Sequence, residues 1–401
     1  MTTELYLDTA RLGRMCRGAR MAEQDFGRLV SRLGSSLYLE RFLANGFRAL
    51  PGHLRKRVPQ LRCWQGVAGF RQGIADFVGQ PQGGTAHFFS QSSALLRFAA
   101  DCLFERAQRV LVTDLGWPAY TAALNDIAIA RHKSLSVVSL KDQLLRDKID
   151  DHDLIEQVVA AYGQRGCDAI FLSDISYLGV RLPVERILAR LGDACQFSVV
   201  DGAQAFNHRP IDLSRIPCDL YLTGTQKWFC SYHPLRIAFL GNFRHAEWIE
   251  RVAHHTEPKR DALFSFCRTL EGRPQMAYGE TVNVSALIAA AGALQQMSRR
   301  PASRLTLWQR LTENAATLAT WLGGSPFVPA IRSPSLQSGI MLLRNLHSPE
   351  DAPQPERADL AKSGLIASAF PGGLLRLSMP TIPFSFHQMS TIMRALHRLQ
   401  N

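Results

Sequence analysis

The sequence lacks the features of several large classes of protein. It has eight cysteines but no C-x-x-C pair, which argues against a zinc ribbon and against a disulfide framework. Its longest apolar-rich run, "SALIAAAGAL", is too short to span a bilayer, and its first residues, "MTTELYLDTARLGRM", have no apolar core of signal-peptide length. We therefore expect a cytoplasmic protein that has no membrane partner and no metal site.

Lysine is also scarce in this chain. Seven of the 46 basic residues are lysine and the rest are arginine, so a lysine inside an apolar stretch is not background surface charge. Lys227 has such a place, because it lies in "TGTQKWFC", directly after "DLYL", which has the pattern of a buried strand. Burying an amine costs free energy unless something uses it, so Lys227 is a candidate catalytic residue.

The charge of the chain is strongly basic but dispersed. The formal net charge is +12 and the isoelectric point is near 9.6, which could indicate an anionic partner such as nucleic acid. The two dense basic clusters, at residues 53–57 and 298–304, contain no interleaved aromatic residues, unlike a surface that binds single-stranded nucleic acid. Scattered arginine is more typical of a solvated surface, so we expect no nucleic-acid partner and favour an anionic small molecule.

The middle of the chain alternates short apolar runs with segments of helical period. Between about residues 85 and 242 the candidate strands are "RVLVTD", "LSVVSL", "DAIFLSD", "QFSVVD", "LYLTG" and "RIAFLG", and stretches such as "SSALLRFAADCLFERA" have helical spacing. This pattern predicts an α/β fold with a doubly wound, mostly parallel sheet. After about residue 290 the pattern changes to that of a smaller α+β domain. Ligands of doubly wound sheets bind beyond the carboxyl ends of the strands.

Two predicted strands that follow each other in the chain end in polar residues. Asp201 and Gln204 lie at and just after the end of "QFSVVD", and Lys227 follows the next strand about 26 residues later. Because the carboxyl ends of parallel strands meet at one edge of a sheet, we expect Asp201 and Lys227 to lie close together. A purely structural ion pair is the alternative interpretation.

Two further strand ends supply groups for an anion and for a flat ring. Ser92 and Ser93 begin an apolar-faced helix, whose free backbone amides and dipole favour an anion, although plain helix capping would also explain them. Trp117 follows "RVLVTD", where an indole could stack on a flat ring, and taken alone it would be a core residue. An anion cradle, an aromatic lid, an acid and an amine together match pyridoxal 5'-phosphate.

Two of these residues would then do chemistry with that cofactor. Lys227 would form a Schiff base with the cofactor aldehyde and, once displaced by the substrate amine, would act as the base at the α carbon. Asp201 would hold the ring nitrogen protonated, so that the ring withdraws electrons from the α carbanion.

Nearly the whole chain resembles the class V aminotransferase family of fold type I pyridoxal-phosphate enzymes, which includes cysteine desulfurases, kynureninases and related lyases and epimerases. The resemblance is carried, in the family's order, by "LYLDTA", "SQSSALL", "VTDLGWPAY", "LSDISYLGVRLPVERI", "VVDGAQAFNHRPIDL", "TGTQKW", "YGETVNVSAL" and "GLLRLSMP". It implies a large cofactor-binding domain over residues 18–285 and a small domain formed by residues 1–17 with 286–401. It also implies cofactor contacts along these segments, by Ser92, Ser93, Trp117, Tyr177, Asp201, Gln204, Gln226, Lys227 and Thr281.

The same resemblance implies how substrate and partner subunit bind. Thr281 resembles a residue that reaches the phosphate of a neighbouring subunit, so we expect a homodimer with shared active sites. Arg376, in "GLLRLSMP", resembles the arginine that binds the substrate carboxylate. A planar guanidinium can hold a carboxylate by two parallel hydrogen bonds.

Several positions depart from the family pattern. The chain has Trp117 where desulfurases have histidine, Tyr177 where an asparagine is expected at the ring hydroxyl, and Gln226 where a histidine precedes the lysine. The Gly-Pro-x-Gly turn expected next is "SYHPLR", which introduces Arg236. Arg11 and Arg236 are candidates for binding a distal anionic group of the substrate. The C-terminal segment before "GLLRLS" has no cysteine, so desulfurase activity is not expected.

The sequence therefore predicts an enzyme that acts on an amino acid through an external aldimine, and aminotransferase chemistry is the leading hypothesis. A β- or γ-eliminating lyase, such as a carbon-sulfur lyase, is the alternative because both reactions share the α carbanion. A non-catalytic regulatory relative is the third hypothesis. The retained Asp201 and Lys227 argue against it, and we find no helix-turn-helix pattern at either end.

Overall fold

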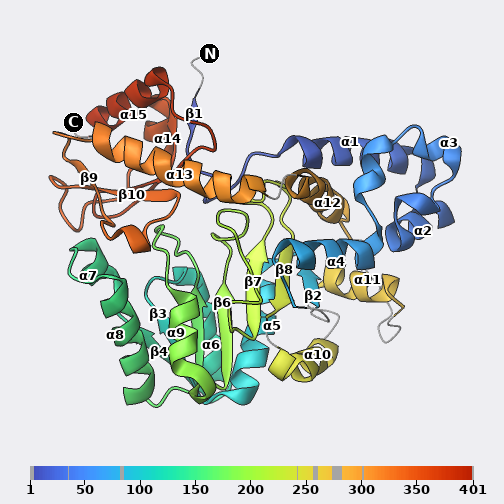
Figure 1. The fold of residues 1–401 in the computed structure, drawn as a ribbon, viewed down its shortest axis with the longest axis horizontal. Helices are drawn as coiled ribbons and strands as arrows, with labels where there is room; N and C mark the ends of the chain where they lie inside the picture. Colours follow the sequence, from blue (N-terminus) through green and yellow to red (C-terminus); the bar gives the residue numbers. More distant parts are fainter. Residues whose placement is uncertain are drawn as a thin grey trace.

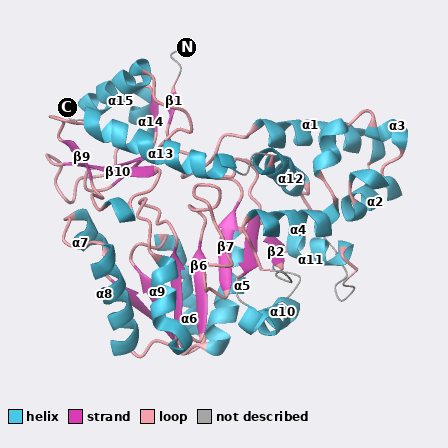
Figure 2. Cartoon of the chain, in the orientation of Figure 1, coloured by secondary structure: helices cyan, strands magenta, loops and turns pink. Residues whose placement is uncertain are grey.

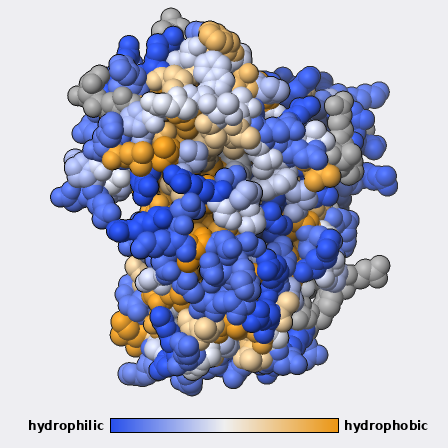
Figure 3. All heavy atoms as spheres, turned by 60° about the vertical axis from the view of Figure 1, so that its left-hand side comes forward, coloured by the Kyte–Doolittle hydropathy of each residue, from blue (hydrophilic) through white to orange (hydrophobic). Residues whose placement is uncertain are grey.

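The computed structural model describes residues 4–34, 36–81, 85–241, 243–255, 261–272, 282–299 and 302–399. Figure 1 shows a larger part around a long sheet and a smaller part that contains the C-terminal strands and helices. On the side seen in Figure 3, hydrophilic residues cover most of the surface and hydrophobic residues form separate patches. Within the described residues, no helix has the length and apolar character needed to cross a membrane.

The larger part is built on a seven-stranded sheet in the order β2-β8-β7-β6-β5-β3-β4. Its strands are β2 (Ala86–Phe89), β3 (Arg109–Thr113), β4 (Ser134–Val138), β5 (Ala169–Ser173), β6 (Phe197–Asp201), β7 (Leu220–Gly224) and β8 (Arg236–Leu240). Strands β3 to β7 run parallel, which confirms the predicted mostly parallel sheet. Strand β8 runs antiparallel to β7, so its first residue, Arg236, lies opposite Gly224 at the end of β7.

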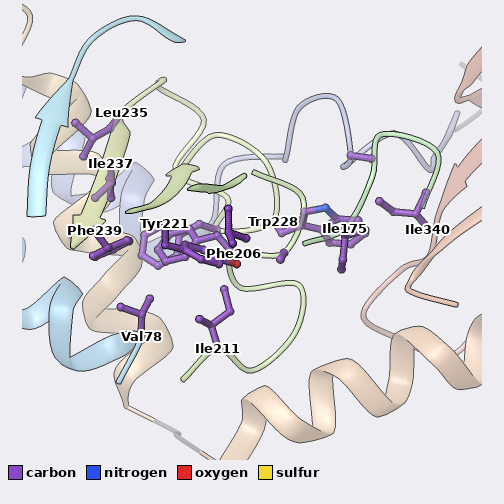
Figure 4. Packing of buried hydrophobic residues seen from close by; sticks show 14 of the residues in the cluster. Val78, Ile175, Phe206, Ile211, Tyr221, Trp228, Leu235, Ile237, Phe239 and Ile340 are labelled. Atoms are coloured by element: carbon purple, nitrogen blue, oxygen red, sulfur yellow. The ribbon is translucent and has the colours of Figure 1, made fainter. Parts of the chain in front are cut away.

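Helices cover both faces of this sheet, as Figure 2 shows. They are α4 (Gly66–Phe77), α5 (Ser92–Arg106), α6 (Pro118–Ala130), α7 (Lys141–Leu145), α8 (Asp151–Gln164), α9 (Val184–Leu191), α10 (Ala246–His255) and α11 (Ala262–Leu270). Because successive strand residues point to opposite faces, Val199 joins the core under α5 and α10, whereas Val200 joins the core under α8 and α9. In that second core Tyr221 lies near Phe206 and Phe239 (Figure 4). Burial on both faces explains why the central strands are continuous apolar runs.

The N-terminal helices α1 (Arg17–Leu33), α2 (Leu37–Asn45) and α3 (Gly52–Arg55) lie beside the sheet (Figure 1). Of these, α1 packs along α12 (Ser285–Ser298). Helices α1 and α12 approach most closely at two glycines: a Cβ added to Gly18 would lie 2.3 Å from the carbonyl oxygen of Gly292, and the reverse distance is 2.4 Å. A side chain at either position would therefore push the helices apart.

The C-terminal part contains an antiparallel sheet in the order β12-β13-β10-β9 and a two-stranded sheet in which β1 pairs with β11. Its elements are β1 (Leu5–Tyr6), α13 (Ala302–Trp321), β9 (Phe327–Pro329), β10 (Ile340–Asn345), α14 (Arg357–Lys362), β11 (Leu365–Ile366), β12 (Ser368–Phe370), β13 (Leu374–Ser378) and α15 (Phe386–Arg398). A capping box between Ser385 and Gln388 fixes the start of α15. Strand β1 pairs with β11, and α12 packs on α1. The division into a large domain, 18–285, and a small domain, 1–17 with 286–401, stays a prediction.

Candidate active site

A cavity of about 930 Å³ lies between the larger part and the C-terminal part. Ser173, Asp201 and Gly224, the last residues of β5, β6 and β7, line it. Phe370 and Arg376 of the C-terminal sheet line it as well. The cavity therefore lies beyond the carboxyl ends of the parallel strands, where doubly wound sheets bind their ligands.

The structure brings Asp201 and Lys227 together at this cavity. Asp201 is 8% exposed, and its Oδ1 accepts a hydrogen bond from the N–H of Ala203 at 3.0 Å. Burial raises the pKa of Asp201, and the charge of Lys227 opposes that rise. The Lys227 side chain reaches solvent only in part; burial lowers its pKa to about 8, against the opposite effect of Asp201. About a tenth of this free amine is therefore neutral at pH 7.

The loop that carries Lys227 is held by the N-terminal segment and by its own side chains. The N–H of Gly13 donates to the carbonyl of Gln226 at 2.7 Å, and a Cβ at Gly13 would lie 1.9 Å from the carbonyl oxygen of Lys227. Within the loop, Ser231 Oγ donates to the carbonyl of Thr225 at 3.0 Å. These contacts hold the lysine in place just past the end of β7.

Gln204 lines the cavity but uses its amide to join separate segments of the chain. Its Nε2 donates to the carbonyl of Ala10 at 2.7 Å, and its Oε1 accepts from Trp228 Nε1 at 3.0 Å. The Trp228 ring in turn stacks on His208, with centroids 3.9 Å apart. The predicted cofactor contact of Gln204 stays a prediction, and it would use the second N–H of the amide.

The first turn of α5 faces the cavity through Ser92, whereas Ser93 is exposed and does not line it. The capping interpretation of these serines is wrong, because Gln91 occupies the N-cap position and makes no side-chain capping bond. The backbone N–H groups of Ser92 and Ser93 have no hydrogen-bond acceptor among the described residues. The free donors of this helix start therefore remain available for an anion.

Aromatic residues form one wall of the cavity. Trp117 is 45% exposed, so the interpretation of this residue as part of the core is wrong. Its ring meets Tyr177 edge-on at 5.4 Å, and Tyr177 meets Phe370 in the same way at 5.6 Å. Tyr177 thus lies between the Trp117 and Phe370 rings, on a cavity wall that both parts of the protein contribute to.

Tyr120 is a cavity residue that the sequence reasoning missed. It lies one helical turn after Trp117 in α6 and also lines the cavity. Burial raises the pKa of Tyr120 and nearby Asp201 adds to the rise, whereas a hydrogen bond with Ser92 and the charge of Arg236 oppose it. The signal that could have found it is its place in the first turn of the helix that follows Trp117.

Arg376 is buried and held by several acceptors. Its Nη1 donates to the carbonyl of Tyr177 at 2.9 Å, and its Nη2 donates to Ser368 Oγ at 3.0 Å and pairs with Asp8 at 3.4 Å. Its Nε is buried without a partner. Burial lowers the pKa of Arg376, and Asp8 opposes that change. Asp8, which also pairs with Arg357 at 3.4 Å, is a second residue that the sequence reasoning missed, although it lies in the "LYLDTA" segment.

The remaining predicted residues have different positions. Arg11 lines the cavity and is exposed, whereas Gln226 is 8% exposed and its Oε1 is buried without a hydrogen-bond partner. Arg236 also lines the cavity, and its Nε is buried without a partner. Thr281 lies outside the described residues.

Comparison with known proteins identifies a family for the chain. Residues 37–319 match the family model described as aminotransferase class-V. An isopenicillin N epimerase from Amycolatopsis lactamdurans is 31% identical over 112 residues, which are 28% of this chain and 27% of that protein. An isopenicillin N epimerase from Streptomyces clavuligerus is 34% identical over 91 residues, which are 23% of this chain and 22% of that protein. The matched segments thus span about a quarter of the length of these curated relatives.

Solved structures share the fold over almost the full chain. A cysteine desulfurase from Escherichia coli has a TM-score of 0.70 at 14% identity, with 99% of this chain and 95% of that chain covered. An alanine-glyoxylate aminotransferase from Nostoc sp. has a TM-score of 0.67 at 15% identity, with 100% and 96% covered. At these identities the likeness concerns the fold alone, and it confirms the predicted fold type I architecture.

Proposed function

The chain belongs to the class V aminotransferase family, whose members depend on pyridoxal 5'-phosphate, and we propose that it is an aminotransferase that acts on an amino acid. The observation that carries the proposal is Lys227, an amine with a pKa of about 8 next to a buried Asp201. Transamination needs one base that moves a proton at the substrate α carbon. Lys227 supplies such a base in a cavity that also contains Arg376.

The residues present fit this cofactor. Arg236 Nε is a buried donor without a partner, and the N–H groups of Ser92 and Ser93 at the start of α5 have no acceptor among the described residues. These groups match a phosphate at one end, Lys227 matches an aldehyde, and Asp201 matches a ring nitrogen. Bound there, the cofactor supplies an electron-withdrawing ring that stabilises negative charge at the substrate α carbon.

The side chains of this protein then divide the work of the reaction. Lys227 Nζ removes the α proton and holds it for return. The Asp201 carboxylate would stabilise a proton on the nitrogen of the cofactor ring. The aromatic wall of Trp117 and Tyr177 limits access of water to the α carbon. Arg376 orients the substrate through its carboxylate, and the direction of the guanidinium is set by Asp8.

A panel of amino acids tests the proposed reaction. We expect turnover that requires a keto-acid acceptor and yields one keto acid and one new amino acid per cycle. The panel is run with and without the acceptor, and both products are measured by chromatography. Release of pyruvate and a thiol without an acceptor would contradict transamination and support the eliminating lyase instead.

Epimerisation is a second candidate, favoured by the local likeness to two isopenicillin N epimerases. Inversion requires a proton donor on the far side of the α carbon from Lys227, and Tyr177 is the cavity hydroxyl that we would assign to it. An epimerase would exchange the α proton of its product with deuterium in heavy water and would form no keto acid. An aminotransferase would lose activity when the acceptor is left out.

We also propose a homodimer with shared active sites, on the resemblance of the segment around Thr281 to one that reaches a neighbouring subunit. If so, each site is incomplete in a monomer. We expect sedimentation at assay concentrations to give a dimer, and dilution below the dissociation constant to lower specific activity. A monomer with full activity would remove this part of the proposal.

Arg376→Lys should raise the Michaelis constant for the amino acid by roughly tenfold or more, a loss of about 1.4 kcal/mol of binding free energy. The reason is that an ammonium group cannot reproduce the planar fork that holds a carboxylate by two hydrogen bonds. Steady-state kinetics measures the effect, and the absorbance of the bound cofactor should stay unchanged. Arg357→Lys is the matched control, because Arg357 lines the same cavity and pairs with the same Asp8 but is half-exposed. An unchanged constant in Arg376→Lys would mean that another group holds the carboxylate.

A further inference from the structure

Arg236 is a largely buried cation that no described residue satisfies. It begins β8 directly opposite Gly224 at the end of β7, on the edge of the sheet that faces the cavity. Its Nε is buried without a partner, and its guanidinium makes no hydrogen bond or ion pair with the described residues. A buried guanidinium without acceptors costs free energy, so this position indicates a missing anion.

Other buried arginines of this protein have their acceptors within the chain. Arg209 pairs with Asp174 at 2.8 Å and with Glu185 at 2.9 Å. Arg376 pairs with Asp8 and also donates to a carbonyl and a hydroxyl. Each of these two guanidinium groups thus has acceptors within the chain, including Arg376, which we propose for the substrate carboxylate. The Arg236 guanidinium has no such acceptor among the described residues.

The groups around Arg236 are suited to an anion with several oxygens. A Cβ added at Gly224 would lie 2.4 Å from Arg236 Nη1 and 2.6 Å from Gln226 Oε1, so both side chains approach the same point. Tyr120 is close enough to Arg236 for the guanidinium charge to lower the pKa of its phenol. Tyr120 also shares a hydrogen bond with Ser92, at the start of α5. Gln226 is 8% exposed, and its side-chain amide would contact an anion through its N–H groups, because the amide oxygen only accepts hydrogen bonds. The amide, the phenol, the guanidinium and the helix start thus surround one region of the cavity.

We propose that Arg236, together with Gln226 and the first turn of α5, binds the phosphate of the cofactor. This inference rests on the proposed function. In the family pattern a histidine is expected at position 226, where this chain has the uncharged Gln226. The proposal assigns the positive charge at the phosphate to Arg236 instead. A phosphate monoester carries nearly two negative charges, which a helix start alone compensates only in part. The planar fork of an arginine can hold two phosphate oxygens at once. Arg236 would then not bind a distal group of the substrate.

The test compares two ligands that differ only in the phosphate. Apoprotein is titrated with pyridoxal 5'-phosphate and with pyridoxal, and dissociation constants are measured for wild type and Arg236→Gln. We expect the variant to bind pyridoxal phosphate roughly a hundredfold more weakly and pyridoxal within about twofold of wild type. The ³¹P resonance of the bound cofactor in Arg236→Gln should also shift from its position in the wild type. Arg357→Gln, a change at another arginine of the same cavity, should keep the wild-type preference for the phosphorylated ligand.

Several outcomes would overturn the inference. Unchanged affinity for pyridoxal phosphate in Arg236→Gln, with a higher Michaelis constant for the substrate, would place Arg236 at the substrate. Equal losses for both ligands would indicate a structural role. If Arg236→Gln does not fold, Arg236→Lys carries the test, and we expect it to lose phosphate preference only in part because the charge remains. Wild-type protein that binds neither ligand would overturn the proposed function itself, which separates the two failures.

Discussion

Lys227→Ala should lower turnover by at least roughly a thousandfold, which corresponds to about 4 kcal/mol of activation free energy. The variant lacks the base that moves the α proton, and no other amine lies next to Asp201 among the described cavity residues. Borohydride reduction of the wild type followed by peptide mapping should place the cofactor label on Lys227. Label on another lysine, or turnover that survives the substitution, would contradict the assignment.

Lys141→Ala is the matched control for this prediction. Lys141 lines the same cavity at the start of α7, so its removal changes the charge of the cavity without removing the proposed base. We expect it to keep turnover within about tenfold of wild type. Added methylamine or ethylamine should restore part of the turnover of Lys227→Ala, because a small free amine can occupy the space and take the proton. A structural defect in the variant would not respond to the added amine.

The lowered pKa of Lys227 also predicts a pH dependence of cofactor loading. The neutral amine is the nucleophile, and with a pKa of about 8 it forms about a tenth of the population at pH 7, against roughly one part in 3,000 for an ordinary lysine. The rate at which apoprotein takes up the cofactor should therefore rise with pH and level off above about pH 8. Stopped-flow absorbance measures this rate. A rise that continues to pH 10 would show that burial does not depress the pKa in solution.

The sheet and two of its strand ends were predictable from the sequence for simple physical reasons. Central strands buried on both faces are continuous apolar runs. The strands that end at Asp201 and near Lys227 can therefore be recognised in the amino-acid sequence. Parallel direction then brings their carboxyl ends to one edge. This is enough to expect that Asp201 and Lys227 lie close together.

The positions of Arg236 and Gln204 depend on strand direction and tertiary contacts, which a local sequence pattern does not show. Strand β8 has the same apolar pattern as its neighbours, and only its antiparallel direction brings Arg236 to the cavity edge beside Gly224. Gln204 has the residue type of a ligand-binding amide, and its Nε2 and Oε1 also bond to Ala10 and Trp228, which leaves the second N–H for the predicted cofactor contact. Strand direction and long-range hydrogen bonds are decided by the whole fold, so a local sequence pattern does not show them.

Asp201→Ala should lower turnover at least roughly a hundredfold, or about 2.7 kcal/mol, while cofactor binding remains measurable. Without the carboxylate, the ring nitrogen is no longer held in its protonated form, and the ring stabilises negative charge at the α carbon less well. Steady-state turnover and a cofactor titration of the same variant give the two quantities. Near-normal turnover would show that this carboxylate does not set the protonation of the ring.

A charged cofactor analogue separates that electrostatic role from a structural one. Pyridoxal phosphate that is methylated on its ring nitrogen carries the positive charge permanently, so it should raise the turnover of Asp201→Ala above the value with the natural cofactor. The same substitution also removes the charge that raises the pKa of Lys227, so this pKa should fall below about 8 and cofactor loading should level off at lower pH than in wild type. Both effects follow from one missing carboxylate. If Asp201→Ala gains no turnover from the methylated cofactor, Asp201 does not act through the charge of the ring nitrogen. If the variant takes up cofactor with the wild-type pH profile, Asp201 does not influence the pKa of Lys227.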